Sequence, residues 1–201
     1  PPRPIDAHKG TFGRAMVVAG SANYTGAAYL AAAAATRVGT GLVTLALAGS
    51  LHPILASKLT EATYLLLPES LGALTPAGIG ILTPRLPECQ ALLLGSGLGQ
   101  AEETLEFVYR LLGIEAKTSR PIGFHTRAAQ REAGSATPLP PLVIDADGLN
   151  ALAKIQNWWK SLPKGSILTP HPGEMARLAD IPIEEVMRDR IGLTKRAASE
   201  W

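Results

Sequence analysis

A histidine between two prolines, in the segment TPHPGE at residues 169–174, has surroundings that suggest chemistry. Pro172 suits the first turn of a helix and Glu174 suits its positive end, so both fit a helix start. A helix start does not explain His171. The two prolines hold its backbone, and its imidazole is expected at an exposed edge of the fold. A lone histidine is usually structural or solvated, and a ligand role for His171 stays open beside that explanation.

Carboxylates cluster in a second segment, DADGLN, which also follows a short apolar run. Asp145 and Asp147 bracket Ala146, and Asn150 lies three residues further on. Such a pair could hold Mg²⁺ through waters or accept hydrogen bonds from ribose hydroxyls. In the alternative interpretation Asp147 caps the following helix and Asp145 is a hydrogen-bonded turn residue.

A third segment, AGSANYTGAA, places Gly20 to Gly26 just before an alanine-rich stretch with high helix propensity. A helix N-terminus with glycine before it favours an anion, so Gly26 is a candidate for a phosphate-binding loop. The spacing is not that of a Walker loop, and no lysine follows Gly26. The alternative is a plain turn from strand to helix, with Thr25 as the N-cap.

The fourth segment, GSGLG, spaces Gly95, Gly97 and Gly99 as G-x-G-x-G, which differs from the dinucleotide fingerprint G-x-G-x-x-G. Glycine here would let a ligand approach the backbone closely. A tight turn that needs positive φ is the alternative explanation.

These segments need a scaffold that brings them together, and the apolar runs of the chain predict one. The runs cover residues 14–20, 41–47, 62–67, 90–95, 142–145 and 165–168, with helices expected at 25–37 and 101–112. Continuous hydrophobicity is typical of parallel strands covered on both faces. We therefore predict a doubly wound, mainly parallel α/β sheet flanked by helices, whose strands end at one ligand-binding rim.

Composition excludes several classes of protein. The formal charge of +2 gives no field that would favour nucleic acid or a membrane surface. No apolar stretch approaches the roughly 20 residues that span a bilayer. Cys89 is the single cysteine, so no internal disulfide is possible, and a reducing, cytoplasmic location is expected. His8, His52 and His125 have no metal-binding spacing with one another or with Cys89.

Three segments stand apart from the strand and helix pattern. Residues 1–7 are rich in proline and are interpreted as a linker from a preceding domain. Residues 115–141 lack a sustained period and are predicted to form a loop insertion. Trp158 and Trp159 are expected to pack on the domain, with a partner surface as the lesser alternative.

Five segments, taken in order, carry a family resemblance: HKGTFGRAMVVAGS, TGAAYLAAAAATRVGTGLVT, LLLGSGLGQ, VIDADGLNALA and ILTPHPGEMARL. From about His8 onward, with residues 115–141 excepted, the chain resembles the ADP- or ATP-dependent NAD(P)H-hydrate dehydratases, which belong to the ribokinase-like superfamily. The resemblance implies an enzyme that restores hydrated NADH or NADPH. A nucleotide, ADP or ATP, phosphorylates the ring hydroxyl with Mg²⁺ present, and phosphate is then eliminated.

The resemblance also implies roles for particular residues. The hydrated dinucleotide would contact Ala27, Gly97 and His171, and Asp145 and Asn150 would line the same cleft.

A metal role is implied for one further residue. Glu174 is similar to the glutamate of the superfamily's N-x-x-E motif, with His171 at the asparagine position. Glu174 would therefore hold hydrated Mg²⁺ through water.

Family members continue with a V-L-K-G-like nucleotide loop and a G-[ST]-G-D motif, and neither occurs in these 201 residues. The aspartate of the second motif is the expected general base, so we expect no catalytic residue in this chain. Residues 8–201 are interpreted as a partial ribokinase-like domain of a longer protein, which exposes apolar surface at its end. The resemblance further implies a homo-oligomer and fusion to an N-terminal NAD(P)H-hydrate epimerase domain.

Two other functions remain open from the sequence. One is a ribokinase-like kinase of a small alcohol or vitamin precursor, and the other is a non-catalytic module that binds a dinucleotide.

Overall fold

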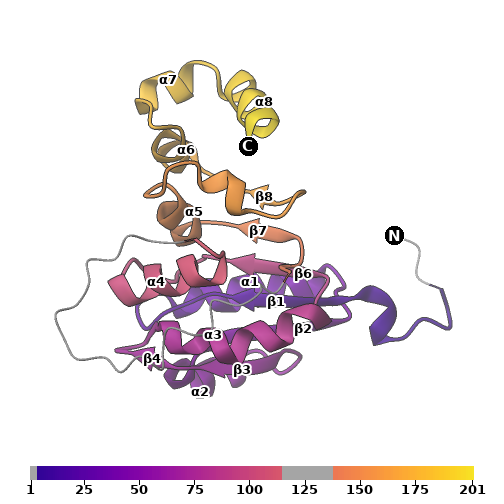
Figure 1. The fold of residues 1–201 in the computed structure, drawn as a ribbon. Coiled ribbons are helices and arrows are strands. Elements are labelled where there is room, and N and C mark those ends of the chain that lie inside the picture. The colour runs from indigo at the N-terminus through magenta and orange to yellow at the C-terminus, as the bar shows by residue number, and fades with distance from the viewer. Residues whose placement is uncertain (1–3, 115–137) are drawn as a thin grey trace.

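A parallel sheet forms the centre of the molecule. The chain is described by a computed structural model, which covers residues 4–114 and 138–201. Its strands in the main sheet are β1 (Arg14–Val18), β2 (Leu42–Ala48), β3 (Thr63–Leu67), β6 (Ala91–Leu94), β7 (Leu142–Ile144) and β8 (Ile167–Leu168). They lie in the order β3-β2-β1-β6-β7-β8, and each neighbouring pair is parallel (Figure 1). Each predicted apolar run overlaps one of these strands, so the doubly wound parallel sheet is confirmed.

The strand order places a switch point between β1 and β6. From β1 the chain moves outward through β2 to β3, and it then returns to β6 and moves outward on the other side. At such a point the loops after the two central strands diverge and leave a crevice at their carboxyl ends. The segments that follow β1 and β6 are AGSANYTGAA and GSGLG, so the topology puts the two glycine-rich segments next to each other.

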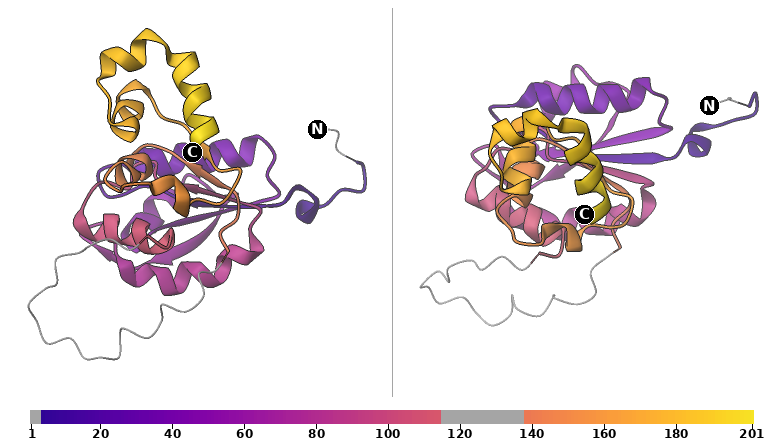
Figure 2. Two further views of the ribbon diagram at one scale, coloured as in Figure 1. Left: turned by 45° about the horizontal axis from the view of Figure 1, so that its top comes forward. Right: turned by 90° about the horizontal axis from the view of Figure 1, so that it is seen from above.

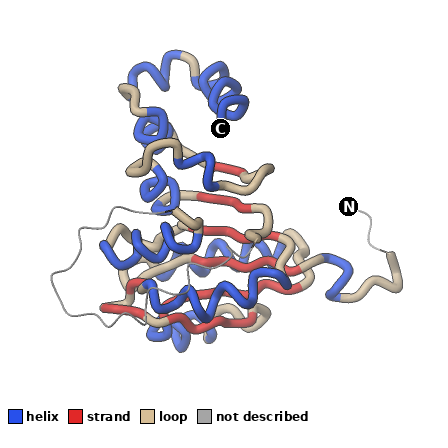
Figure 3. Tube along the Cα trace, in the orientation of Figure 1, coloured by secondary structure: helices blue, strands red, loops and turns tan. Residues whose placement is uncertain are grey.

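Helices cover both faces of the sheet. The α-helices are α1 (Thr25–Arg37), α2 (His52–Ala56), α3 (Ile79–Leu82), α4 (Glu102–Leu111), α5 (Asp147–Leu152), α6 (Pro172–Ala179), α7 (Ile183–Arg188) and α8 (Arg190–Glu200). Helix α1 lies on one face, and α3 and α4 lie on the other (Figure 2). The tube in Figure 3 shows how strands and helices alternate along the chain.

Shorter elements complete the described chain. They are the 3₁₀ helices η1 (Lys9–Phe12), η2 (Gly49–Leu51), η3 (Pro76–Gly78), η4 (Thr83–Glu88) and η6 (Trp158–Ser161), and an antiparallel ribbon of β4 (Glu69–Ser70) and β5 (Ala73–Leu74). The sequence did not predict the ribbon, because strands of two residues carry no readable period.

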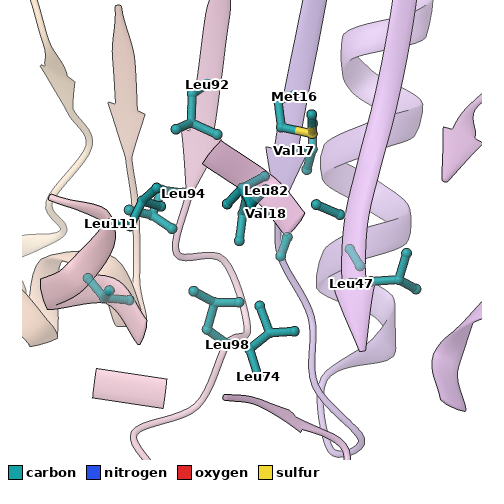
Figure 4. Packing of buried hydrophobic residues seen from close by; sticks show 14 of the residues in the cluster. Met16, Val17, Val18, Leu47, Leu74, Leu82, Leu92, Leu94, Leu98 and Leu111 are labelled. Atoms are coloured by element: carbon teal, nitrogen blue, oxygen red, sulfur yellow. The ribbon is translucent and has the colours of Figure 1, made fainter. Parts of the chain in front are cut away.

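The core is built mainly from aliphatic side chains, in keeping with the low aromatic content. Met16, Val17 and Val18 of β1 pack in one cluster with Leu92 and Leu94 of β6 (Figure 4). Burial on both sides of these central strands explains why their sequences are apolar at every position.

Helix α1 meets the sheet through small residues. Ala28 and Ala32 are fully buried and Ala33 is 5% exposed, whereas Ala34 on the opposite side of the helix is exposed. Methyl groups let the helix axis approach the strands closely, and this explains the alanine-rich sequence beyond its helix propensity.

The last three helices continue the chain beyond the β8 edge of the sheet (Figure 1). Met175 of α6, Val186 of α7 and Ala197 of α8 form a small hydrophobic cluster of their own. In this region Met187 and Ile191 are 55% and 73% exposed.

The two adjacent tryptophans pack on the domain as predicted, although their helix is of the 3₁₀ type. Trp158 is 2% exposed, and the centre of its ring lies 4.7 Å from that of Trp201. Trp159 stacks on Trp201 at 6.2 Å. The end of α8 is thereby fixed against η6.

Some predictions fall outside the described residues. His125 and most of the predicted insertion at 115–141 lie there, as do residues 1–3 of the predicted linker. Pro141 is described, and its carbonyl oxygen accepts a hydrogen bond from the Leu92 amide at 3.0 Å, so the end of that segment leads into β7.

Within the described ranges, no helix combines the length and the hydropathy that a bilayer crossing requires.

The close contact of α1 with the sheet can be tested by a matched pair of substitutions. We expect Ala32→Leu to lower the free energy of unfolding by about 1–3 kcal/mol, because the larger side chain has no space at the sheet. Ala34→Leu, on the exposed side of the same helix, is expected to change it by less than about 0.5 kcal/mol. Urea denaturation measures both, and equal effects would contradict the packing described here.

Candidate functional site

The loops that follow β1 and β6 are bonded to each other. The Gly20 amide donates to the carbonyl oxygen of Ser96 at 2.9 Å, and the Gly95 amide donates to that of Val18 at 3.2 Å. A Cβ placed on Gly97 would lie 2.7 Å from the Cβ of Ala27, closer than real Cβ atoms approach. Ala27 and Gly97, two of the predicted ligand positions, therefore lie in direct contact.

The glycine turn after β6 needs its glycines for two separate reasons. Gly95, Gly97 and Gly99 have φ values of 127°, 69° and 80°, so the predicted tight turn with positive φ is confirmed. In addition, a Cβ on Gly95 would overlap the carbonyl oxygen of Asp145. Leu98 is 1% exposed within the core and anchors the turn (Figure 4).

Asp145 holds the ends of three strands together. Its Oδ2 accepts a hydrogen bond from the Ser96 hydroxyl at 3.0 Å, and its Oδ1 accepts one from the Thr169 hydroxyl at 2.8 Å. Ser96 follows β6, Asp145 follows β7 and Thr169 follows β8. The Asp145 side chain thus bonds to the two neighbouring strand ends and not within its own turn. The sequence interpretation missed these partners, which are the hydroxyl residues directly after the neighbouring strands.

The interpretation of Asp147 as the N-cap of the following helix, α5, is wrong. It is the first residue of the helix, and its Oδ2 accepts a hydrogen bond from the Gly99 amide at 2.8 Å. The N-cap is Ala146, whose φ of 49° costs a non-glycine residue about 1–3 kcal/mol. This backbone turn points Asp147 across the rim toward the glycine turn.

Asn150 continues the same chain of hydrogen bonds toward α6. Its Nδ2 donates to Oδ1 of Asp147 at 3.4 Å, and its Oδ1 accepts a hydrogen bond from Nε of Arg177 at 2.9 Å. The buried face of α5 is fixed from the other side, because the Tyr109 hydroxyl donates to the carbonyl oxygen of Ala151 at 3.2 Å. Burial raises the pKa of Tyr109, so its hydroxyl stays protonated and can donate at neutral pH.

His171 has a structural role that the sequence interpretation did not find. It is the N-cap of α6, and its Nδ1 accepts hydrogen bonds from the amides of Gly173 at 3.0 Å and Glu174 at 3.4 Å. In return, Oε2 of Glu174 accepts a hydrogen bond from the His171 amide at 2.9 Å. The pair forms a capping box in which histidine takes the place of serine or threonine. Pro172 and Glu174 lie in the first turn, as predicted.

The capping box also fixes the tautomer of His171. Because Nδ1 accepts hydrogen bonds, the ring proton is on Nε2, which lies 3.2 Å from Oε1 of Glu174. Both ring nitrogens are thus used within the first turn, while 63% of the side chain is exposed. The surface that His171 offers to a ligand is mainly the face and carbon edge of the imidazole, which suits positioning rather than proton abstraction.

Gly26 lies at the start of α1, in a hollow that Asn150 does not line. It lines a cavity of about 290 Å³ together with Thr25, Tyr29 and Lys58, between the start of α1 and α2. The prediction that Thr25 caps α1 is wrong. Thr25 is the first residue of the helix, and the N-cap is Tyr24, whose side chain makes no capping hydrogen bond. The anion-binding role of Gly26 stays a prediction.

The carboxylates described here do not form a direct metal site. No group of three or more His, Cys, Asp or Glu side chains suited to a metal ion occurs among residues 4–114 and 138–201. Glu174 is 7% exposed at its side chain, and both of its oxygens face His171. Direct ligation would break the capping box, so a contact between Glu174 and hydrated Mg²⁺ through water remains a prediction.

The fold and the rim define the class of protein. A ribokinase-like superfamily protein from Enterococcus faecalis superposes on 99% of the chain with a TM-score of 0.72, at 21% identity and over 58% of its own length, which establishes the fold. Residues 15–201 match the family of NAD(P)H-hydrate dehydratases, and the chain belongs to this family. The predicted ribokinase-like fold and the family resemblance are confirmed.

Individual relatives extend beyond the residues present here. The bifunctional NAD(P)H-hydrate repair enzyme Nnr of Moorella thermoacetica is 37% identical over 202 residues, which cover the whole chain and 34% of that protein. The ADP-dependent (S)-NAD(P)H-hydrate dehydratase of Bacillus subtilis is 29% identical, over 59% of its length. A B. subtilis ADP/ATP-dependent NAD(P)H-hydrate dehydratase co-crystallised with ATP and Mg²⁺ is 28% identical with a TM-score of 0.65, over 59% of that chain. The chain thus spans about a third to three fifths of these proteins.

The close approach between the glycine turn and β7 predicts unequal effects at two glycines. Gly95 and Gly113 both have positive φ, but nothing lies within 4 Å of a Cβ placed on Gly113. We expect Gly95→Ala to lower the free energy of unfolding by more than about 3 kcal/mol, because steric overlap adds to backbone strain. Gly113→Ala is expected to cost about 1 kcal/mol from φ alone. Thermal and urea denaturation compare the two, and similar losses would remove the contact with Asp145 as the cause.

Proposed function

We propose that this chain forms the substrate-binding part of an enzyme that dehydrates hydrated NADH or NADPH with ADP or ATP as phosphoryl donor. The observation that carries the proposal is the hydrogen-bonded rim at the switch point. Ala27 and Gly97 touch there, and the bonds of Asp145 connect this contact to the segment that holds His171. Family membership over residues 15–201 supports the same reaction.

The chemistry of the reaction sets what these residues have to do. The terminal phosphoryl group of the nucleotide is transferred to the ring hydroxyl, and the bond between ring carbon and oxygen then breaks as phosphate leaves. The hydrated ring needs a surface with little side-chain bulk, which Ala27 and Gly97 provide. The exposed imidazole of His171 can pack against the dinucleotide and hold it in place.

The described carboxylates of the rim are poor candidates for the base. Each oxygen of Asp145 already accepts a hydrogen bond from a hydroxyl, and those of Glu174 face His171. This supports the expectation that the proton acceptor is supplied by the G-[ST]-G-D segment of the complete protein. The adenine nucleotide and Mg²⁺ are proposed to bind there too, in keeping with the B. subtilis relative co-crystallised with both.

The wider organisation is proposed from the relatives. The Nnr relatives are bifunctional, and we expect fusion to an N-terminal NAD(P)H-hydrate epimerase domain here. A homo-oligomer in the cytoplasm is the expected state of the complete protein.

The reaction can be followed directly in the complete gene product. With hydrated NADPH, Mg²⁺ and either ADP or ATP, we expect the absorbance of reduced nicotinamide to recover and phosphate to be released. A kinase of a small alcohol would leave a phosphorylated product without this recovery, and a binding module would bind the hydrate without turnover. Absence of recovery with both nucleotides would rule out the dehydratase.

Two substitutions separate the capping role of His171 from its proposed ligand role. His171→Ala removes the acceptor for the amides of Gly173 and Glu174, and is expected to lower the free energy of unfolding by about 0.5–2 kcal/mol. His171→Asn keeps an acceptor at the N-cap and should retain most of that stability. We expect both variants to bind hydrated NADPH several-fold more weakly in calorimetric titration. Unchanged affinity in the Asn variant would take His171 out of the ligand site.

A further inference from the structure

A polar pocket lies beside His171, between α5 and α6. It has a volume of about 410 Å³ and is lined by Gln100, Asn150, Ala153, Lys154 and Arg177. The volume is within the range of small-ligand sites, and large enough for a phosphate group with the sugar attached to it. Of its lining residues the sequence motifs singled out only Asn150, because the pocket is built from three separate segments.

The charge of the pocket is positive and uncompensated. Lys154 and Arg177 are exposed, and no carboxylate is among the lining residues. Among the ion pairs formed within the described parts of the chain, none involves Lys154 or Arg177. The nearby carboxylate of Asp147 is held by the Gly99 amide and by Asn150.

Arg177 is oriented in a way that leaves donors free for a ligand. Its Nε donates to Oδ1 of Asn150 at 2.9 Å, which fixes the plane of the guanidinium. No hydrogen bond from its two terminal nitrogens to another described residue is found. A fixed guanidinium binds the oxygens of a phosphate in a defined geometry, and the Lys154 ammonium adds a second charge.

The pocket is continuous with the surface around His171. A Cβ placed on Gly173 would lie 3.1 Å from Cε1 of His171 and 3.8 Å from Nη1 of Arg177. The imidazole and the guanidinium therefore flank the same glycine at the start of α6. A ligand that packs on His171 needs to extend by only a few bonds to reach Arg177.

We propose that Gln100, Asn150, Lys154 and Arg177 bind a phosphate group of the hydrated dinucleotide, an assignment that rests on the proposed function. Lys154 and Arg177 supply the charge, and Gln100 supplies a neutral amide donor. The phosphate is either in the diphosphate bridge, which both dinucleotides share, or at the ribose 2′ position of the NADPH form.

The test measures binding of hydrated NADH, hydrated NADPH and ADP, each alone, to the complete gene product by calorimetric titration. Lys154→Gln breaks no hydrogen bond found in the structure, so it should fold normally, and it is expected to raise the Kd of hydrated NADPH about tenfold at low salt. Lys154→Glu should raise the Kd further. Both effects should shrink as the ionic strength rises, because the charges are exposed. Arg177→Gln is a second variant, with its melting temperature measured because it also loses the bond to Asn150.

Charge-matched controls are available at exposed residues that do not line the pocket. Lys160→Gln and Arg188→Gln remove one positive charge each and should change the Kd by less than about twofold. Loss of affinity for both hydrates supports binding of the diphosphate, whereas loss for hydrated NADPH alone supports binding of the 2′-phosphate.

Three results would overturn the assignment. If the unsubstituted chain binds the hydrates and the Lys154 and Arg177 variants bind equally well, the pocket is not the phosphate site and the proposed function stands. If only the affinity for ADP falls, the pocket serves the phosphoryl donor. If the unsubstituted chain binds neither hydrate, the assignment fails together with the proposed substrate.

Discussion

The carboxylate of Asp145 is the interaction on which the rim depends. Parallel strands end in separate loops, so a connection in addition to the backbone ladder of the sheet helps to hold those loops in register. Asp145 supplies that connection, because one oxygen binds the hydroxyl after β6 and the other binds the hydroxyl after β8. This one side chain therefore contacts both the glycine turn and the segment leading to His171. Both oxygens of this carboxylate are already paired, which suits a residue that organises a site without reacting in it.

Much of the scaffold was predictable from the sequence, because continuous apolar runs and an alanine-rich segment of high helix propensity can be recognised from residue type alone. Helix α1 has the predicted bounds, Thr25–Arg37, and every predicted strand is present. Boundaries were less predictable where polar residues continue an apolar run. The run at 165–168, for example, contributes only Ile167 and Leu168 to the sheet.

The site was only partly predictable, and the reason is physical. Positive φ at Gly97 could be anticipated from residue type, whereas its contact with Ala27 depends on how far α1 approaches the sheet. The roles of Asp147 and Arg177 depend on neighbours distant in sequence, as each bonds to a residue on another segment. His171 was harder still, because imidazole is an uncommon N-cap and its acceptor role appears only once the ring orientation is known.

The direct contact between Gly97 and Ala27 also limits how the site can change. A methyl group at residue 97 would need the space that the methyl of Ala27 occupies, so neither position can gain bulk unless the other loses it. Ser96 and Thr169 are also linked through Asp145, because removing either hydroxyl leaves one oxygen of the carboxylate without its partner. Variation at this rim is therefore expected to be concerted, with compensating changes on strands that are far apart in the sequence and adjacent in the fold.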